Sequence, residues 1–327
     1  QNPGWRGQVT YWLYCCQRVG IATGMKYFGP HDWYRKGAES LLSSQRGNGS
    51  WREWNMTCFA LLFLIKGRGP IIMNKLRYDG KWNLHPRDLA NLADEVGKMK
   101  EQRINWQVIE TTSPLEEMHE SPILYITAEE QVDFPDDFKT KLRRFTDTGG
   151  TVLLEASCGN PGAGAFWEDL CREVWPEWEL RRLDKEHPLW TADLNITGGR
   201  PVLEGISDGV RAFVFYAPRN LSCYWHLKSV TMNANAFSTG SNLYAYATDR
   251  GRLRGRSARG KADVGEKYAG ELPACASGVS EVTVARLKHG GRWNAARHYR
   301  PWGVLSEDTG ERMGVTIRER EPVDIGQ

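Results

Sequence analysis

After residue 70, short apolar segments alternate regularly with longer helical ones, and this pattern limits the folds that the chain can adopt. We predict helices at Pro86–Gln102, Pro135–Thr148 and Gly164–Val174. We predict strands at Ile72–Arg77, Trp106–Glu110, Ile123–Thr127, Thr151–Glu155 and Arg211–Tyr216. Strands that alternate with helices are the signature of a mostly parallel sheet with helices on both faces. The sequence therefore predicts a three-layer α/β domain.

The layout of this domain is typical of a flavodoxin-like or class I glutamine amidotransferase-like fold. After the last predicted strand, we expect a terminal helix in "GSNLYAYATDR". In sheets of this kind ligands gather at the carboxyl ends of the strands, so we expect any site to lie there.

The first seventy residues have a different, all-helical pattern. Three helices are expected, in "QVTYWLYCCQRVGIA", "HDWYRKGAESLLSSQ" and "NMTCFALLFLIKGRG", with Asp32 and Asn55 as N-caps of the second and third. Three helices of this hydrophobicity do not close a core by themselves.

Composition limits the class of protein. A chain of 327 residues with 40% hydrophobic and 25% charged residues is expected to form two or more soluble globular domains. The longest apolar run, Cys58–Ile65, is too short to cross a membrane. The chain begins at Gln1 without a Met or a signal-like segment, so localisation is left open and we expect sequence to be missing at both ends.

The charge pattern argues against a nucleic-acid partner. Net charge is only +3, and six basic residues lie together between Arg250 and Lys261 without an interleaved aromatic residue. A flexible linker is the favoured interpretation of that run. Seven scattered cysteines fit neither a disulfide framework nor a structural zinc site, so no metal or cofactor is expected.

A short sequence near residue 80 is nearly repeated close to the C-terminal end of the chain. "KLRYDGKWN" is matched by "RLKHGGRWN", and "RINWQVIET" by "RMGVTIRER", which indicates an internal repeat of domain size. We therefore predict four segments: a helical region at 1–69, the α/β domain at 70–250, a basic linker at 251–280 and the start of a second α/β copy at 281–327.

The helical region resembles a known repeat. In "KGAESLLSSQRGNGSW" the spacing of Gly37, Leu41, Gln45, Gly49 and Trp51 is similar to the repeat of terpenoid cyclase and prenyltransferase α/α toroids. The resemblance implies structural roles for Gln45 and Trp51. The acid motif and the zinc ligands of those enzymes have no counterpart here, so their chemistry is not implied.

The α/β segment resembles a bacterial family, the domain of unknown function 4159. The matching stretches include "KLRYDGKWNLHPRDLANL", "PILYITAEEQVDF", "LRRFTDTGGTVLLEASCG", "EHPLW" and "LSCYWH". The resemblance runs over about residues 27–250 and implies the fold and the arrangement after toroid repeats. It implies no activity and leaves the ligand or partner unknown.

The strongest candidate for a catalytic residue is Cys158, which follows the predicted strand "TVLLEA" and precedes a Gly-rich loop. A cysteine at such an elbow can act as a nucleophile. The His-x-Glu partner of class I amidotransferases is missing at His187 and His226.

The other ligand-binding candidates lie in strand-end loops: Asp79, Trp82, Glu129, Tyr224 and His226. Two functions follow. The favoured one is a non-catalytic binding or scaffold module, and the alternative is a Cys-dependent hydrolase or amidotransferase-like enzyme. Backbone strain at Cys158 with a histidine nitrogen in reach would favour the enzyme.

Overall fold

The computed structural model describes residues 8–248, 280–288 and 315–324. It forms two compact units, Gln1–Gly260 and Lys261–Gln327. In the second unit, β10 (Ser280–Lys288) and β11 (Val315–Asp324) pair in parallel. That orientation is the one a second α/β copy requires, and the repeat itself stays a prediction. The predicted linker lies outside the described residues, except for its last residue.

The first unit is built around a seven-stranded, mostly parallel sheet. Its strand order is β4-β3-β5-β6-β9-β8-β7. Strand β8 runs antiparallel to both of its neighbours, β9 and β7, and the other neighbouring strands pair in parallel. The strands are β3 (Ile71–Arg77), β4 (Asn105–Glu110), β5 (Ile123–Ala128), β6 (Thr151–Ala156), β7 (Arg181–Arg182), β8 (Glu204–Ser207) and β9 (Ala212–Ala217). The five predicted strands correspond to β3, β4, β5, β6 and β9.

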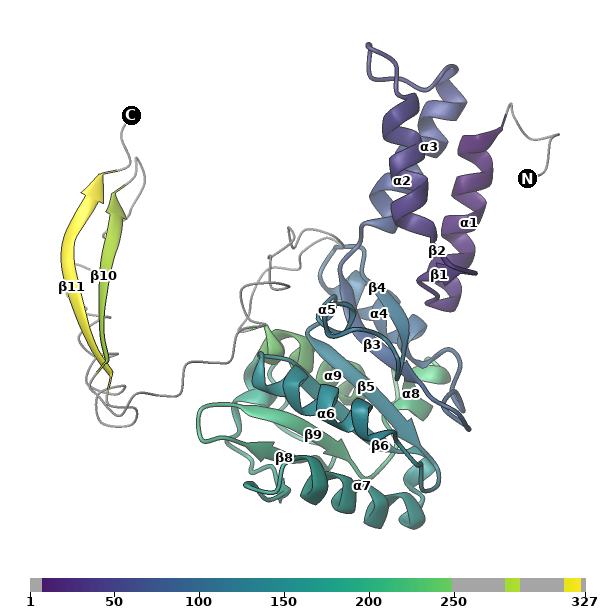
Figure 1. Ribbon diagram of the computed structural model, residues 1–327. Helices are drawn as coiled ribbons and strands as arrows, with labels where there is room; N and C mark the ends of the chain where they lie inside the picture. Colours follow the sequence, from purple (N-terminus) through teal and green to yellow (C-terminus); the bar gives the residue numbers. More distant parts are fainter. Residues whose placement is uncertain (1–7, 249–279, 289–314, 325–327) are drawn as a thin grey trace. The chain divides into compact units, whose positions relative to one another are not determined.

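Helices cover both faces of the sheet (Figure 1). The helices are α4 (Asp88–Met99), α5 (Leu115–Met118), α6 (Asp136–Asp147), α7 (Pro161–Val174), α8 (Ser222–His226) and α9 (Ala234–Ala247), with short 3-10 turns η2 (Ser157–Gly159) and η3 (Pro188–Thr191). Alternate strand residues enter two separate cores: Tyr125 packs with α4, α8 and α9, whereas Leu124 packs with α5, α6 and α7. The three-layer α/β prediction is confirmed.

The helical region precedes the sheet. It contains α1 (Val9–Thr23), α2 (Trp33–Ser44) and α3 (Trp54–Gly67), with a small antiparallel pair, β1 (Tyr27–Phe28) and β2 (His31–Asp32), between the first two. Asp32 caps α2 by accepting from the backbone N–H groups of Tyr34 and Arg35. These helices share a small core around Leu41 and Phe63.

Gln45 and Trp51 of the toroid-like motif lie between α2 and α3. The Trp51 indole is buried and donates to the backbone oxygen of Leu41 at 2.7 Å. The Gln45 amide donates to Gly49 at 2.9 Å within the following loop. Both side chains stabilise the turn between α2 and α3, and the toroid assignment stays a prediction.

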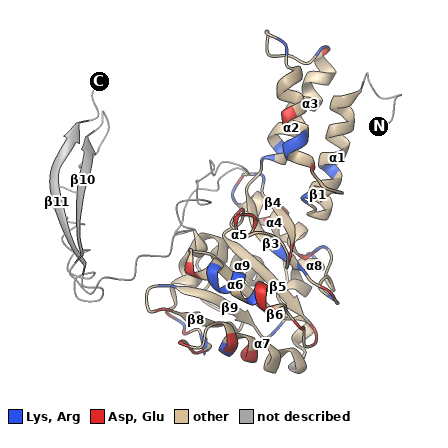
Figure 2. Cartoon of the chain, in the orientation of Figure 1, with Lys and Arg blue, Asp and Glu red and all other residues tan. Residues whose placement is uncertain are grey.

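Several large apolar side chains of the helical region remain exposed, among them Trp12, Trp54 and Ile65; Trp54 is 81% accessible. Within the described part of the chain, no helix has the length and apolar character needed to cross a membrane. Charges of both signs lie along α6 (Figure 2), with acidic residues in its first turn and Arg144 in its last. This arrangement complements the helix dipole.

Candidate active site

The parallel strands β3, β5, β6 and β9 end at one edge of the sheet, because parallel strands run in the same direction. Among the loops that leave this edge are residues 78–87, 129–135, 157–160 and 218–221. Cys158 lies in the loop 157–160, within η2 and just before α7.

The backbone of Cys158 is strained. Its φ of 55° and ψ of 18° place a non-glycine residue in the left-handed region, which is uncommon and costs free energy. The turn is held on both sides: the hydroxyls of Ser157 and Thr127 lie 2.5 Å apart in the interior, and the Asn160 side chain accepts from the N–H of Gly162 at the start of α7. The Cys158 side chain is consequently exposed at the strand end.

His85 faces Cys158 from the loop that follows β3. Its Nε2 lies 3.8 Å from Cys158 Sγ, within hydrogen-bond reach for sulfur. The imidazole is only 8% exposed, and this burial lowers the pKa of His85 from its ordinary value, with a smaller opposing effect from Asp88. A neutral histidine beside a thiol is equipped to accept its proton.

A buried lysine holds the His85 loop in place. Lys75 Nζ donates to Asp88 Oδ2 at 2.7 Å, to Asn83 Oδ1 at 2.9 Å and to the backbone oxygen of His85 at 3.1 Å. Lys75 and Asp88 are almost completely inaccessible, so their mutual neutralisation is required for either to be buried.

The other ring nitrogen of His85, Nδ1, is connected through the Ser222 hydroxyl to the buried carboxylate of Glu155. His85 Nδ1 lies 3.0 Å from Ser222 Oγ, and Ser222 Oγ donates to Glu155 Oε1 at 2.7 Å. The Tyr125 hydroxyl donates to Glu155 Oε2 at 2.6 Å. Burial raises the pKa of Glu155, and these hydrogen bonds oppose that shift because they favour the ionised form.

Sequence reasoning missed His85, Ser222 and Glu155. An amidotransferase-like spacing places the histidine after the cysteine, whereas His85 precedes Cys158 by 73 residues. The one available signal was that His85 lies between the predicted strand Ile72–Arg77 and the predicted helix Pro86–Gln102, just beyond a predicted strand end.

Among the predicted ligand-binding residues, His226 lies beside His85. Its ring centroid is 5.6 Å from that of His85, and its Nδ1 accepts from the N–H of Arg87 at 3.2 Å. Tyr224, from the same short helix α8, is half-buried against the core. Cys223 is also partly buried, and its pKa is raised by burial first and by the neighbouring Cys158 to a smaller extent.

The remaining candidates lie in the loops after β3 and β5. Asp79 is exposed, and Glu129 forms an ion pair with Lys81 at 3.6 Å. Trp82 packs partly against the core, with Lys75 Nζ 5.9 Å from its ring centroid. Within the described part of the chain, none of the three forms a hydrogen bond or ion pair with Cys158. Across residues 8–248 and the two described C-terminal strands, no group of three or more His, Cys, Asp or Glu side chains is arranged to hold a metal ion.

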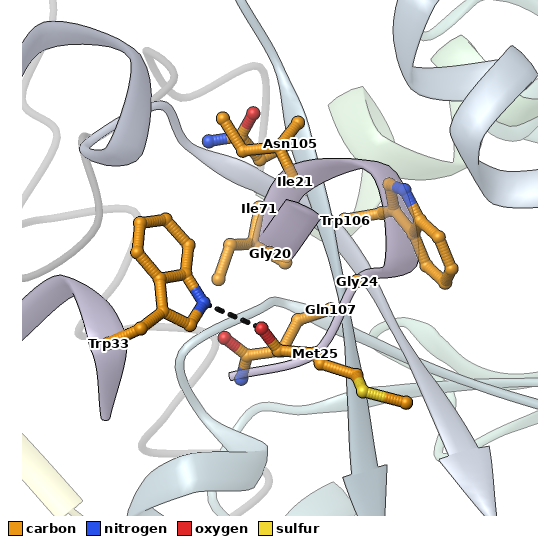
Figure 3. Close-up of a pocket in the computed structure, with 9 residues that line it drawn as sticks. All are labelled: Gly20, Ile21, Gly24, Met25, Trp33, Ile71, Asn105, Trp106 and Gln107. Carbon is orange, nitrogen blue, oxygen red and sulfur yellow. Dashed lines mark hydrogen bonds between the residues drawn. The ribbon is translucent and has the colours of Figure 1, made fainter. Parts of the chain in front are cut away.

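A small pocket lies where the helical region meets β4 (Figure 3). It is lined by Gly20, Ile21, Gly24, Met25, Trp33, Ile71, Asn105, Trp106 and Gln107. The Trp33 indole donates to the backbone oxygen of Met25 at 2.7 Å, the contact drawn in Figure 3. Asn105 Oδ1, Trp106 Nε1 and Gln107 Oε1 are buried without a hydrogen-bond partner among the described residues. This pocket belongs to the joint between two parts of the fold rather than to the strand-end edge.

The fold and site define a three-layer α/β protein with a cysteine-centred arrangement at the carboxyl edge of its sheet. The chain belongs to the family described as a domain of unknown function (DUF4159), whose model matches residues 72–248. The family predicted from the quoted motifs is thereby confirmed. No curated protein matches the chain.

Proposed function

We propose that the chain is a Cys-dependent acyl-transfer enzyme in which Cys158 is the nucleophile and His85 the general base. The observation that carries the proposal is the 3.8 Å approach of His85 Nε2 to Cys158 Sγ at a strained, exposed turn. Strained backbone at a functional residue persists only where its surroundings hold it, and here they do so at the edge where ligands bind.

The reaction class follows from the two side chains. His85 Nε2 takes the thiol proton while Cys158 Sγ attacks the carbonyl carbon of a carboxamide or ester. A carbon–sulfur bond forms, the bond to the amine or alcohol breaks, and the leaving group receives the proton from His85. Water then attacks the thioester with His85 as base, which releases the carboxylic acid and restores the thiol.

The geometry favours the enzyme over the non-catalytic module that the sequence alone favoured. Numbered in chain order, the five parallel strands lie in the order 2-1-3-4-5, which supports a flavodoxin-like topology. The arrangement differs from that of class I glutamine amidotransferases, because His85 precedes the cysteine and Arg87 occupies the position two residues after the histidine.

Alkylation kinetics test the proposal without knowledge of the substrate. Iodoacetamide at pH 7 is expected to label Cys158 at least about tenfold faster than Cys58, because general-base assistance is available only at Cys158. Cys58 is the internal control: it is also exposed, and it lies on α3. Peptide mapping by mass spectrometry separates the two sites.

Two variants sharpen the test. His85→Gln is expected to reduce labelling of Cys158 to the Cys58 rate and leave Cys58 unchanged. With an activated ester such as p-nitrophenyl acetate, the unmodified protein is expected to release a burst of nitrophenol and to carry an acyl group on Cys158, which Cys158→Ala abolishes. If both cysteines label at the same rate and His85→Gln does not change it, the proposal of a Cys-dependent enzyme is contradicted and the binding module is favoured.

A further inference from the structure

We propose that Ser222 is a positioning residue that holds His85 in the tautomer with a proton on Nδ1 and a lone pair on Nε2, through its hydroxyl link to Glu155. The inference rests on the proposed function of Cys158 and His85. It adds a chain of contacts from three separate strand ends, since His85 follows β3, Glu155 is on β6 and Ser222 follows β9.

The count of hydrogens on the Ser222 hydroxyl fixes the direction of each bond. A hydroxyl has one hydrogen to donate and lone pairs to accept. Ser222 donates that hydrogen to Glu155 Oε1, 2.7 Å away. Its oxygen must then accept at the 3.0 Å contact with His85 Nδ1, so the hydrogen on the imidazole lies on Nδ1.

The surroundings of Glu155 show why the hydroxyl points toward the carboxylate. Three further donors reach the same group: the backbone N–H groups of Leu221 and Ser222, both at 3.0 Å, and the Tyr125 hydroxyl. A carboxylate surrounded by donors in this way acts as an acceptor. It therefore has no hydrogen with which to reverse the bond to Ser222.

The tautomer decides whether His85 can serve as a base. With the hydrogen on Nδ1, Nε2 presents its lone pair to Cys158 Sγ, which is the nitrogen within reach. With the hydrogen on Nε2, the same ring would donate toward sulfur and could not take up the thiol proton. The partner of Nδ1 is thus a determinant of reactivity although it does not touch Cys158.

The test is a nitrogen-15 NMR spectrum of the full chain with labelled histidine, in which the His85 signals are identified by their loss in His85→Gln. We expect a protonated Nδ1 and an unprotonated Nε2 in the unmodified protein at pH 7.5. In Ser222→Ala, the Nε2-protonated form is expected to become the major one, and alkylation of Cys158 to slow by about tenfold. In the ester assay kcat should fall while KM is unchanged.

Ser121→Ala is the matched control. Ser121 is as fully buried as Ser222, but it precedes β5 and so lies at the opposite edge of the sheet. It should leave the tautomer and the alkylation rate unaltered. Glu155→Gln gives an independent check, since it keeps the size of the side chain and should shift the tautomer in the same direction as Ser222→Ala.

The outcomes separate this inference from the proposed function. An Nε2-protonated His85 in the unmodified protein, or a tautomer insensitive to Ser222→Ala, overturns the role of Ser222 even if Cys158 proves reactive. A tautomer that responds as expected supports that role even if Cys158 labels no faster than Cys58, in which case the catalytic proposal alone fails.

Discussion

At the scale of single residues, burial controls which histidines take up a proton near neutral pH. His187, in the turn before η3, packs against the rings of Phe215 and Tyr246, and its Nδ1 accepts from the N–H of Leu189 at 3.2 Å. Burial lowers the pKa of His187, and Asp184 opposes the shift to a smaller extent. The folded state therefore resists a proton that the unfolded chain accepts.

This difference predicts a pH-dependent contribution to stability. The contribution of neutral His187 is present above about pH 6.5, the unfolded value, and is lost as the pH falls through the lower pKa of the folded state. His187→Asn keeps a side-chain acceptor for Leu189 and does not titrate. Urea unfolding from about pH 7.5 to 5 should show the original protein losing stability relative to this variant. A constant difference between the two curves would contradict the prediction.

His85 and Cys158 show what a residue-scale pattern conveys. Cys158 was predictable as a candidate because it follows an apolar strand and precedes glycines. His85 was not, because its relation to Cys158 depends on the path of a ten-residue loop, residues 78–87, and not on any local spacing.

At the scale of elements, strands and helices with strong local patterns were predicted well. Asp32 caps α2 as expected. The predicted cap of α3 at Asn55 is wrong, because the helix already begins at Trp54, with Glu53 at the capping position. Strands β7 and β8 were missed: β7 has two residues, both exposed, and β8 contains Gly205, so neither shows the alternation that identifies a strand.

The buried pair of Lys75 on β3 and Asp88 on α4 ties two of these elements together. Lys75→Met removes the charged donor to Asp88 and the donor to the backbone oxygen of His85, so we expect the free energy of unfolding to fall by about 3–5 kcal/mol. Because His85 loses an anchor, alkylation of Cys158 should slow as well. Denaturant unfolding and iodoacetamide labelling measure the two effects.

Lys81→Met is the control for that substitution. Lys81 lies in the loop that also carries His85. Its Nζ is 3.6 Å from Glu129 Oε2 and 3.5 Å from Glu130 Oε1, but its side chain is exposed. Exposed ion pairs contribute little, so the expected loss is below about 1 kcal/mol. Similar losses in both variants would show that burial of the Lys75–Asp88 pair is not what makes it important.

At the scale of the first unit, the helical region covers the edge of the sheet. The backbone N–H of Val108 on β4 donates to Gly24 at 2.8 Å, and Met25 forms a bridge with Val108. Lys26 joins Glu117 and Glu120 across the same joint, at 3.2 Å and 2.8 Å. An edge strand that would otherwise expose unpaired backbone groups is thereby protected.

Hydrogen exchange can measure this protection. Lys26→Ala is expected to speed exchange of the Val108 amide, which faces Gly24. The Ile109 amide, which alternation directs toward β3, should keep its protection. If both amides accelerate equally, the joint and the sheet open together and the edge is not covered independently.

The class of the α/β domain, the position of its five parallel strands and the family could be predicted from the sequence, because periodicity, glycine-ended helices and local motifs act over a few residues. Which side chains meet at the carboxyl edge could be learned only from the folded chain. His85 and Ser222 are 137 residues apart, and their contact depends on the strand order and on the course of two loops. Those are outcomes of global packing, which no short stretch of sequence specifies.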